Sequence, residues 1–172
     1  MGRHKWLQMS LPYSLLSRFL DECVNNPKNE VGAVLYGNIE VEESIFSEYL
    51  KLYVSDSKIV KGDAQGISIE PIKDLFTEST VGFLHSHLTD FRFLTPKDEE
   101  IGKKYGFKAN GITFFDSKDN IAYTSFWYPG FSYPFEVSLL GYKWGNMEII
   151  STYPEQLVRM KRENEKWKRL TL

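Results

Sequence analysis

Cysteine is nearly absent from this sequence of 172 residues, which contains only Cys23. A single cysteine excludes an intramolecular disulfide and the cysteine-rich class of structural zinc sites. Because Cys23 falls in an apolar helical pattern, we expect its thiol to be buried and unreactive.

The sequence also has no large excess of either charge sign and no long apolar run. The formal net charge is −2, so the composition gives no case for nucleic-acid binding. The uncharged stretches are too short and too polar for a membrane span or a signal peptide. We therefore expect a protein of the reducing cytoplasm with no membrane association. A hydrophobic content of 42% is enough for one domain with its own core.

Histidine is rare, yet two of the three histidines, His85 and His87, are separated by one residue. Residues i and i+2 of a strand point to the same face, so both imidazoles can bind one metal ion. The preceding run, 80–84, is apolar and β-prone. Asp98 falls in the first turn of a helix that we expect over 95–105. Two nitrogen ligands, one carboxylate oxygen and an open fourth position are typical of a catalytic zinc site.

Each of these patterns also has an ordinary interpretation. An isolated H-x-H pair is often incidental. Thr95 is a good N-cap, Pro96 suits the first helical position, and Asp98 completes a capping box. Glu30, taken alone, is an exposed carboxylate at the start of a strand. The helix-start interpretation is compatible with the metal interpretation, because a rigid helix start holds a ligand well.

Glu30 begins the short apolar stretch E-V-G-A-V-L-Y-G. With the downstream H-S-H and Asp, it resembles the JAMM (MPN+) family of zinc metalloproteases. The family pattern is a Glu on the first strand, then H-[S/T]-H-P, then a Ser and an Asp at fixed spacing. The resemblance implies that His85, His87 and Asp98 bind zinc. It implies that Glu30 is the general base and that Thr95 stands where the family has the Ser that stabilises the tetrahedral intermediate.

The resemblance covers roughly residues 10–128 and departs from the family pattern at two positions. Leu88 replaces the Pro after the second histidine, so we expect the loop 88–94 to follow a different path. Thr95 replaces Ser and keeps the hydroxyl, but its extra methyl group stiffens the side chain and crowds the site. Neither change removes a ligand or the base.

The fold implied is α/β: a single MPN (JAMM)-like domain in which helices flank a mixed β-sheet. We assign residues 1–150 to this domain and 151–172 to a basic C-terminal helix, which packs on the domain or extends from it. Residues 55–66 are expected to form a polar loop. The remaining pattern predicts helices over 11–25, 72–76 and 95–105, and strands over 30–37, 39–54, 67–69, 80–84, 111–115 and 121–128.

The function implied is that of a zinc-dependent metalloprotease or isopeptidase, which hydrolyses the bond after the C-terminal glycines of a ubiquitin-like modifier. Loops 55–66 and 128–135 are candidates for substrate contact. A regulatory protein partner or a homo-oligomer is compatible with the basic C-terminal stretch, which is otherwise a solvated face. Two alternatives stay open: a non-catalytic MPN-like scaffold that binds a partner, and the same metal set acting on a small molecule or a sulfur carrier.

Overall fold

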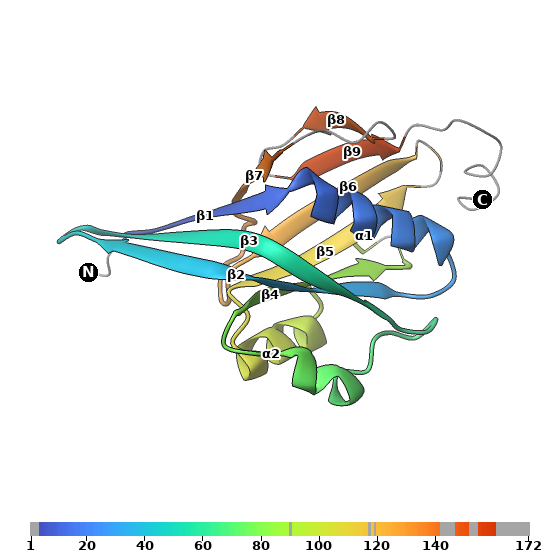
Figure 1. The fold of residues 1–172 in the computed structure, drawn as a ribbon, viewed down its shortest axis with the longest axis horizontal. Coiled ribbons are helices and arrows are strands. Elements are labelled where there is room, and N and C mark those ends of the chain that lie inside the picture. The colour runs from blue at the N-terminus through green and yellow to red at the C-terminus, as the bar shows by residue number, and fades with distance from the viewer. Residues whose placement is uncertain are drawn as a thin grey trace.

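The chain is built on one long, curved β-sheet (Figure 1). The computed structural model describes residues 4–89, 91–116, 118, 120–141, 147–151 and 155–160. Its strands are β1 (His4–Pro12), β2 (Val31–Glu43), β3 (Ser47–Lys61), β4 (Thr80–His87), β5 (Ala109–Asp116), β6 (Ile121–Trp127), β7 (Glu136–Leu140), β8 (Met147–Ser151) and β9 (Gln156–Met160). The helices are α1 (Tyr13–Asn25), the 3-10 helix η1 (Glu70–Leu75) and α2 (Pro96–Tyr105).

The strand order is β7-β1-β3-β2-β4-β5-β6-β9-β8, and the sheet is mixed. β1 runs parallel to both β3 and β7, and β4 runs parallel to β5. β2 lies between β3 and β4 and is antiparallel to both, with Gly32 opposite His85. This register sets the start of β2 beside the end of β4, where the two histidines lie.

The helix α1 forms because apolar residues recur at helical spacing and bury one stripe. Leu16, Phe19, Leu20 and Cys23 are buried in the main core between α1 and one face of the sheet. A smaller core fills the other face, where β2, β3 and β4 pack against η1 and α2. Its buried members are Val34, Val60, Phe83 and Phe107.

The expected α/β fold, an MPN-like sheet flanked by helices, is wrong. Of the described residues, 51% lie in strands and 20% in helices. The two α-helices and η1 cover only parts of a curled, nine-stranded sheet (Figure 1). The chain is a mainly β protein. Much of the sequence that we expected to form a loop or a helix instead forms strands that pair within the sheet.

Four expected elements differ from the structure. Residues 39–54 do not form one strand but belong to the β2–β3 hairpin, and the expected polar loop 55–66 is strand as far as Lys61. Residues 67–69 are not a strand. Of the expected C-terminal helix, Gln156–Met160 form a strand instead, while residues 161–172 lie outside the described residues. The helices over 11–25 and 95–105 are confirmed as α1 and α2.

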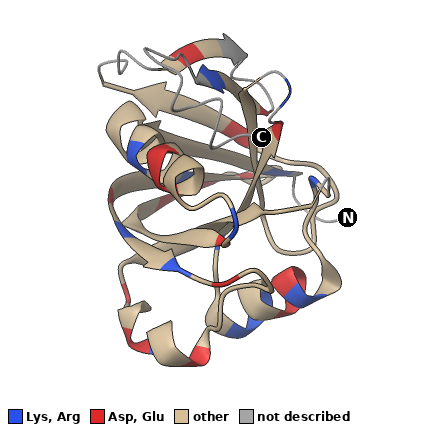
Figure 2. Ribbon diagram, turned by 90° about the vertical axis from the view of Figure 1, so that its right-hand side faces the viewer, with Lys and Arg blue, Asp and Glu red and all other residues tan. Residues whose placement is uncertain are grey.

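Residues of both charge signs are spread over the helices and strands (Figure 2), in keeping with the small net charge. Within the described residues, no helix combines the length and the apolar character that crossing a membrane requires.

Candidate metal centre

Glu30 lies immediately before β2, and its backbone is fixed by the loop that follows β3. The Glu30 amide donates to the carbonyl oxygen of Asp63 at 3.0 Å, and the Gly62 amide donates to the carbonyl oxygen of Glu30 at 2.8 Å. The side chain lies over Gly66, where an added Cβ would stand 3.3 Å from Glu30 Oε2. Gly66 has φ +144°, which disfavours any larger residue. The loop therefore leaves room for the carboxylate and turns it toward β4.

The middle residue of the H-S-H motif joins the two strands. Ser86 is buried, and its hydroxyl accepts a hydrogen bond from the Val31 amide at 2.9 Å. Because Val31 follows Glu30 directly, this bond fixes the start of β2 against the strand that carries both histidines.

His85 and His87 project from the same face of β4, as their spacing predicts. Their Nε2 atoms lie 3.2 Å apart. The His87 Nδ1 lies 2.8 Å from the carbonyl oxygen of Phe91, which can only accept. In a His87 ring that binds a metal ion through Nε2, Nδ1 carries the proton and donates it to this carbonyl. The Nδ1 of His85 is buried without a hydrogen-bond partner in the described part of the chain, and its ring stacks on Phe83 at 5.8 Å.

Asp98 meets both imidazoles from the first turn of α2. Its Oδ1 lies 3.2 Å from His85 Nε2, and its Oδ2 lies 3.3 Å from His87 Nε2. Thr95 is the N-cap: its backbone amide donates to Asp98 Oδ2 at 2.9 Å, and its hydroxyl accepts from the Asp98 amide at 3.1 Å. The expected capping box is therefore present, and it orients the carboxylate toward the histidines.

Asn110 supports the same helix turn from β5. Its side-chain amide donates to the backbone carbonyl of Asp98 at 2.9 Å. Asn110 is buried and packs against Gly102 of α2, where an added Cβ would lie 2.5 Å from Asn110 Nδ2. Because Gly102 has no side chain, the side-chain amide of Asn110 can reach the backbone carbonyl of Asp98.

The protonation equilibria of the site are coupled. Burial raises the pKa of the Glu30 carboxyl above its usual value. Burial alone would raise the pKa of Asp98, but hydrogen bonds to His85 and His87 outweigh it and hold this pKa well below its usual range. Burial likewise opposes the charged form of His87, whose pKa is nevertheless raised by Asp98 and the Phe91 carbonyl. A negative charge on Asp98 is therefore favoured beside the rings.

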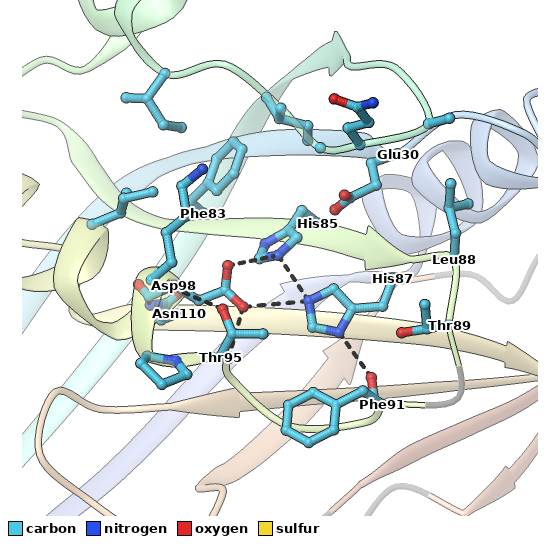
Figure 3. Close-up of a pocket in the computed structure, with 18 residues that line it drawn as sticks. Glu30, Phe83, His85, His87, Leu88, Thr89, Phe91, Thr95, Asp98 and Asn110 are labelled. Atoms are coloured by element: carbon cyan, nitrogen blue, oxygen red, sulfur yellow. Dashed lines mark hydrogen bonds and ion pairs between the residues drawn. The ribbon is translucent and has the colours of Figure 1, made fainter.

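A cavity of about 560 Å³ opens above these groups. Glu30 and Asp98 reach the imidazoles from different sides (Figure 3). Apolar side chains of Ile67, Phe83 and Ile101 contribute to the cavity wall. The polar groups thus meet in a recess that can admit a ligand and exclude part of the solvent.

The donor set fits a small divalent cation such as zinc. With bonds of about 2.0–2.2 Å, two ligands of a tetrahedral zinc ion lie about 3.3–3.6 Å apart. The two Nε2 atoms lie 3.2 Å apart, and Asp98 lies 3.2 Å from His85 through Oδ1 and 3.3 Å from His87 through Oδ2. Ligand atoms of Glu30, His85 and His87 also lie within 4.8 Å of one another. We give more weight to the set with Asp98 because its separations are 3.2–3.3 Å, whereas those of the set with Glu30 extend up to 4.8 Å.

The structure brings together Glu30, His85, His87, Thr95 and Asp98, the five residues singled out from the sequence. The sequence reasoning missed Asn110 and the Phe91 carbonyl, and it gave Ser86 no role. A polar residue within the apolar strand β5 was the available signal for Asn110. A backbone carbonyl has no signature in the sequence.

The sequence matches no protein-family model, and no curated protein matches it.

Proposed function

We propose that this chain is a zinc-dependent metallopeptidase of the JAMM type that acts as an isopeptidase. The observation that carries the proposal is the group formed by His85 Nε2, His87 Nε2 and the Asp98 carboxylate, with a second carboxylate, Glu30, beside the imidazoles on another side (Figure 3). A structural zinc site uses four protein ligands, whereas three ligands and a nearby base are typical of catalytic sites.

His85, His87 and Asp98 would hold the ion. Zinc bound there would act as a Lewis acid. It would lower the pKa of its bound water to about 7 and polarise a carbonyl group. Glu30 accepts the proton of the attacking water and transfers it to the leaving amine. We assign Glu30 the role of base rather than fourth ligand because the sequence resemblance gives it that role. The hydroxyl of Thr95 accepts from the Asp98 amide, so its own proton remains available to donate to a developing oxyanion.

The substrate is proposed from the sequence resemblance: a ubiquitin-like protein or its conjugates, cut after the C-terminal glycines. The cavity supports this in a general way, because its apolar wall can accept an extended chain beside the polar centre. The reducing cytoplasm is the compartment we propose, in keeping with a single cysteine.

The first test is the zinc content of the purified chain by elemental analysis. We expect about one zinc per chain in the wild type and a large loss in His87→Ala and Asp98→Asn. Asparagine at position 98 can still accept the Thr95 amide, so this variant removes the charged ligand while keeping the helix cap. If the wild-type chain takes up no zinc, the enzyme proposal is wrong and the non-catalytic scaffold becomes the better interpretation.

The second test separates the base from the ligands. Glu30→Gln should retain zinc while turnover of ubiquitin-like conjugates falls about 10²–10⁴-fold, the usual contribution of a general base. Glu78→Gln, in the exposed turn before β4, is the matched control and should leave turnover unchanged. Full activity of Glu30→Gln would exclude the role assigned to Glu30. Activity confined to short C-terminal extensions, without isopeptide cleavage, would favour the sulfur-carrier alternative.

A further inference from the structure

We infer that Lys97 is a specificity-determining residue of the cavity: its ammonium group binds a carboxylate of the substrate close to the bond that is cut. The inference deepens the proposed function and rests on it for the reaction, but the binding of a carboxylate can be measured without turnover. Lys97 precedes Asp98 in the first turn of α2 and lines the same cavity.

The charges of the cavity leave Lys97 without a counter-charge once the metal site is filled. Lys97 is the only lysine or arginine among the described residues that line the cavity. The acidic lining residues are Glu30 and Asp98, whose carboxyl groups lie beside the imidazoles (Figure 3). A divalent ion held there would balance both carboxylates, so the charge of Lys97 would remain and would attract an anionic ligand.

The Lys97 amine has no hydrogen bond or ion pair to any other residue that the structure describes. Glu100 stands at the i+3 position of α2, a spacing at which opposite charges can meet on one face of a helix. In η1 the same spacing does join an ion pair, between Glu70 and Lys73. Lys97 lines the cavity instead of pairing along the helix, so its N–H donors are free to bind a ligand.

The stability of α2 does not explain a lysine at this position. The other charges near the ends of the helix follow its dipole, with Asp98 and Glu99 in the first turn and Lys103 and Lys104 in the last. A cation in the first turn opposes the dipole. A role in ligand binding accounts for a residue that the helix itself does not favour.

Apolar side chains on the cavity wall strengthen the attraction between Lys97 and an anion. Ile101 follows Lys97 at the i+4 position of α2 and lines the same cavity, as do Ile67 and Ile69 from the segment before η1. All three isoleucines are partly buried and pack against the small core that contains Phe83. Because these side chains displace water, opposite charges attract more strongly beside them than on an open surface.

The carboxylate can come from an acidic side chain or from the free C-terminus of a short extension. The probes are therefore peptides with a Gly-Gly segment followed by alanines. One pair ends in a carboxylate or in an amide. In a second set, all amidated, Glu or Gln stands either directly before the glycines or directly after them.

The experiment compares the wild type with Lys97→Gln and Lys97→Glu at low ionic strength. We expect the wild type to favour the carboxylate peptide of a pair about threefold to tenfold in kcat/KM. Lys97→Gln should remove this preference and Lys97→Glu should reverse it. Lys97→Glu is expected to fold, because an acidic residue suits the helix dipole. Lys104→Glu is the matched control: it makes the same charge change in an exposed residue of α2 outside the cavity, and it should keep the preference.

Binding of the same peptides to Glu30→Gln, measured by calorimetry, gives a comparison that needs no turnover. Equal kcat/KM and equal affinity within each pair would overturn the inference and leave the proposed function in place. A preference that Lys97→Glu does not change would overturn it as well. If the wild type cuts no peptide, yet carboxylate peptides bind in a way that depends on Lys97, the inference stands and the proposed function fails. A preference confined to the free C-terminus would assign the site to the α-carboxylate, and one confined to Glu would assign it to a side chain.

Discussion

Asp98 serves two local structures with one carboxylate. Its Oδ2 accepts the Thr95 amide in the helix cap and also faces His87, while Oδ1 faces His85. A side chain that belongs to a capping box has few rotamers left, so the carboxylate is oriented before any ion arrives. The cap interpretation and the ligand interpretation of T-P-K-D are therefore both compatible with the geometry.

Cys23 gives a prediction at this scale. Burial raises the pKa of its thiol to about 12, so the reactive thiolate is scarce at neutral pH. We expect the folded chain to resist alkylation at pH 8 and to take up one label per chain in denaturant, measured by mass spectrometry. An unfolded thiol ionises near pH 8.5, so the free energy of unfolding should also fall as the pH rises above about 8.5.

Rapid, stoichiometric labelling of the folded chain at pH 8 would contradict this assignment. The same reagent added along a denaturant series also provides a control. Labelling should follow the unfolding transition recorded by circular dichroism.

The residues of the site differ in how far the sequence could predict them. The spacing of His85 and His87 follows from strand geometry, and the position of Asp98 follows from helix-start chemistry. Nothing local predicted that Asn110 bonds the Asp98 carbonyl, because that contact depends on how β5 lies against α2. The functional roles of these residues remain proposals.

At the scale of elements, α2 depends on its N-cap. Thr95→Val keeps the shape of the side chain but removes the hydroxyl that accepts the Asp98 amide. We expect the free energy of unfolding to fall by about 1 kcal/mol, measured by denaturant unfolding. Thr95→Ser keeps the acceptor and should stay within a few tenths of the wild type.

Equal stability of the valine and serine variants would show that the hydroxyl does not stabilise the helix start. Zinc affinity provides a second comparison, because the valine variant loosens the turn that orients Asp98. It should bind zinc less tightly than the serine variant.

A helix or strand was predictable from the sequence where only one of its faces is buried and the apolar residues recur at a regular spacing. α1 met that condition, whereas α2, in which only Gly102 is buried, was predictable from its cap residues. The second half of β3 did not, because S-D-S-K (55–58) is mostly polar and exposed, although it pairs with β2. At Gln156–Met160, a basic sequence with apolar residues fitted a helix, but pairing with β6 and β8 makes it a strand.

At the scale of the molecule, the β2–β3 hairpin extends away from the main body of the sheet (Figure 1). Ile45 and Phe46 at its tip are 81% and 79% exposed, whereas Leu52 farther along β3 is 1% exposed. We expect the double variant Ile45→Ser/Phe46→Ser to change the free energy of unfolding by no more than about 0.5 kcal/mol. Leu52→Ala should lower it by about 2–5 kcal/mol.

Denaturant unfolding of both variants tests this contrast on one hairpin. A large loss of stability on changing the tip would mean that the exposed side chains contact another part of the chain or a second copy. Sedimentation at two concentrations would then distinguish those cases.

The fold class was the least predictable level. Pairings between distant strands, such as β1 with β7 and β6 with β9, leave no periodic signal in either strand. Several of these strands have only five residues, too few to show alternation clearly. Because the sequence lacks this pairing information, we took the expected fold from the family resemblance. The large fraction of strand in the structure shows that this expectation was wrong.

The place of β1 between β3 and β7 has a consequence for synthesis on the ribosome. β1 leaves the ribosome before Glu136–Leu140, the segment that completes its hydrogen bonds, with Gln8 opposite Glu136. Until that late segment has been translated, one side of β1 is an open edge that can pair with other nascent chains. Slow translation between residues 12 and 136 would lengthen that exposure.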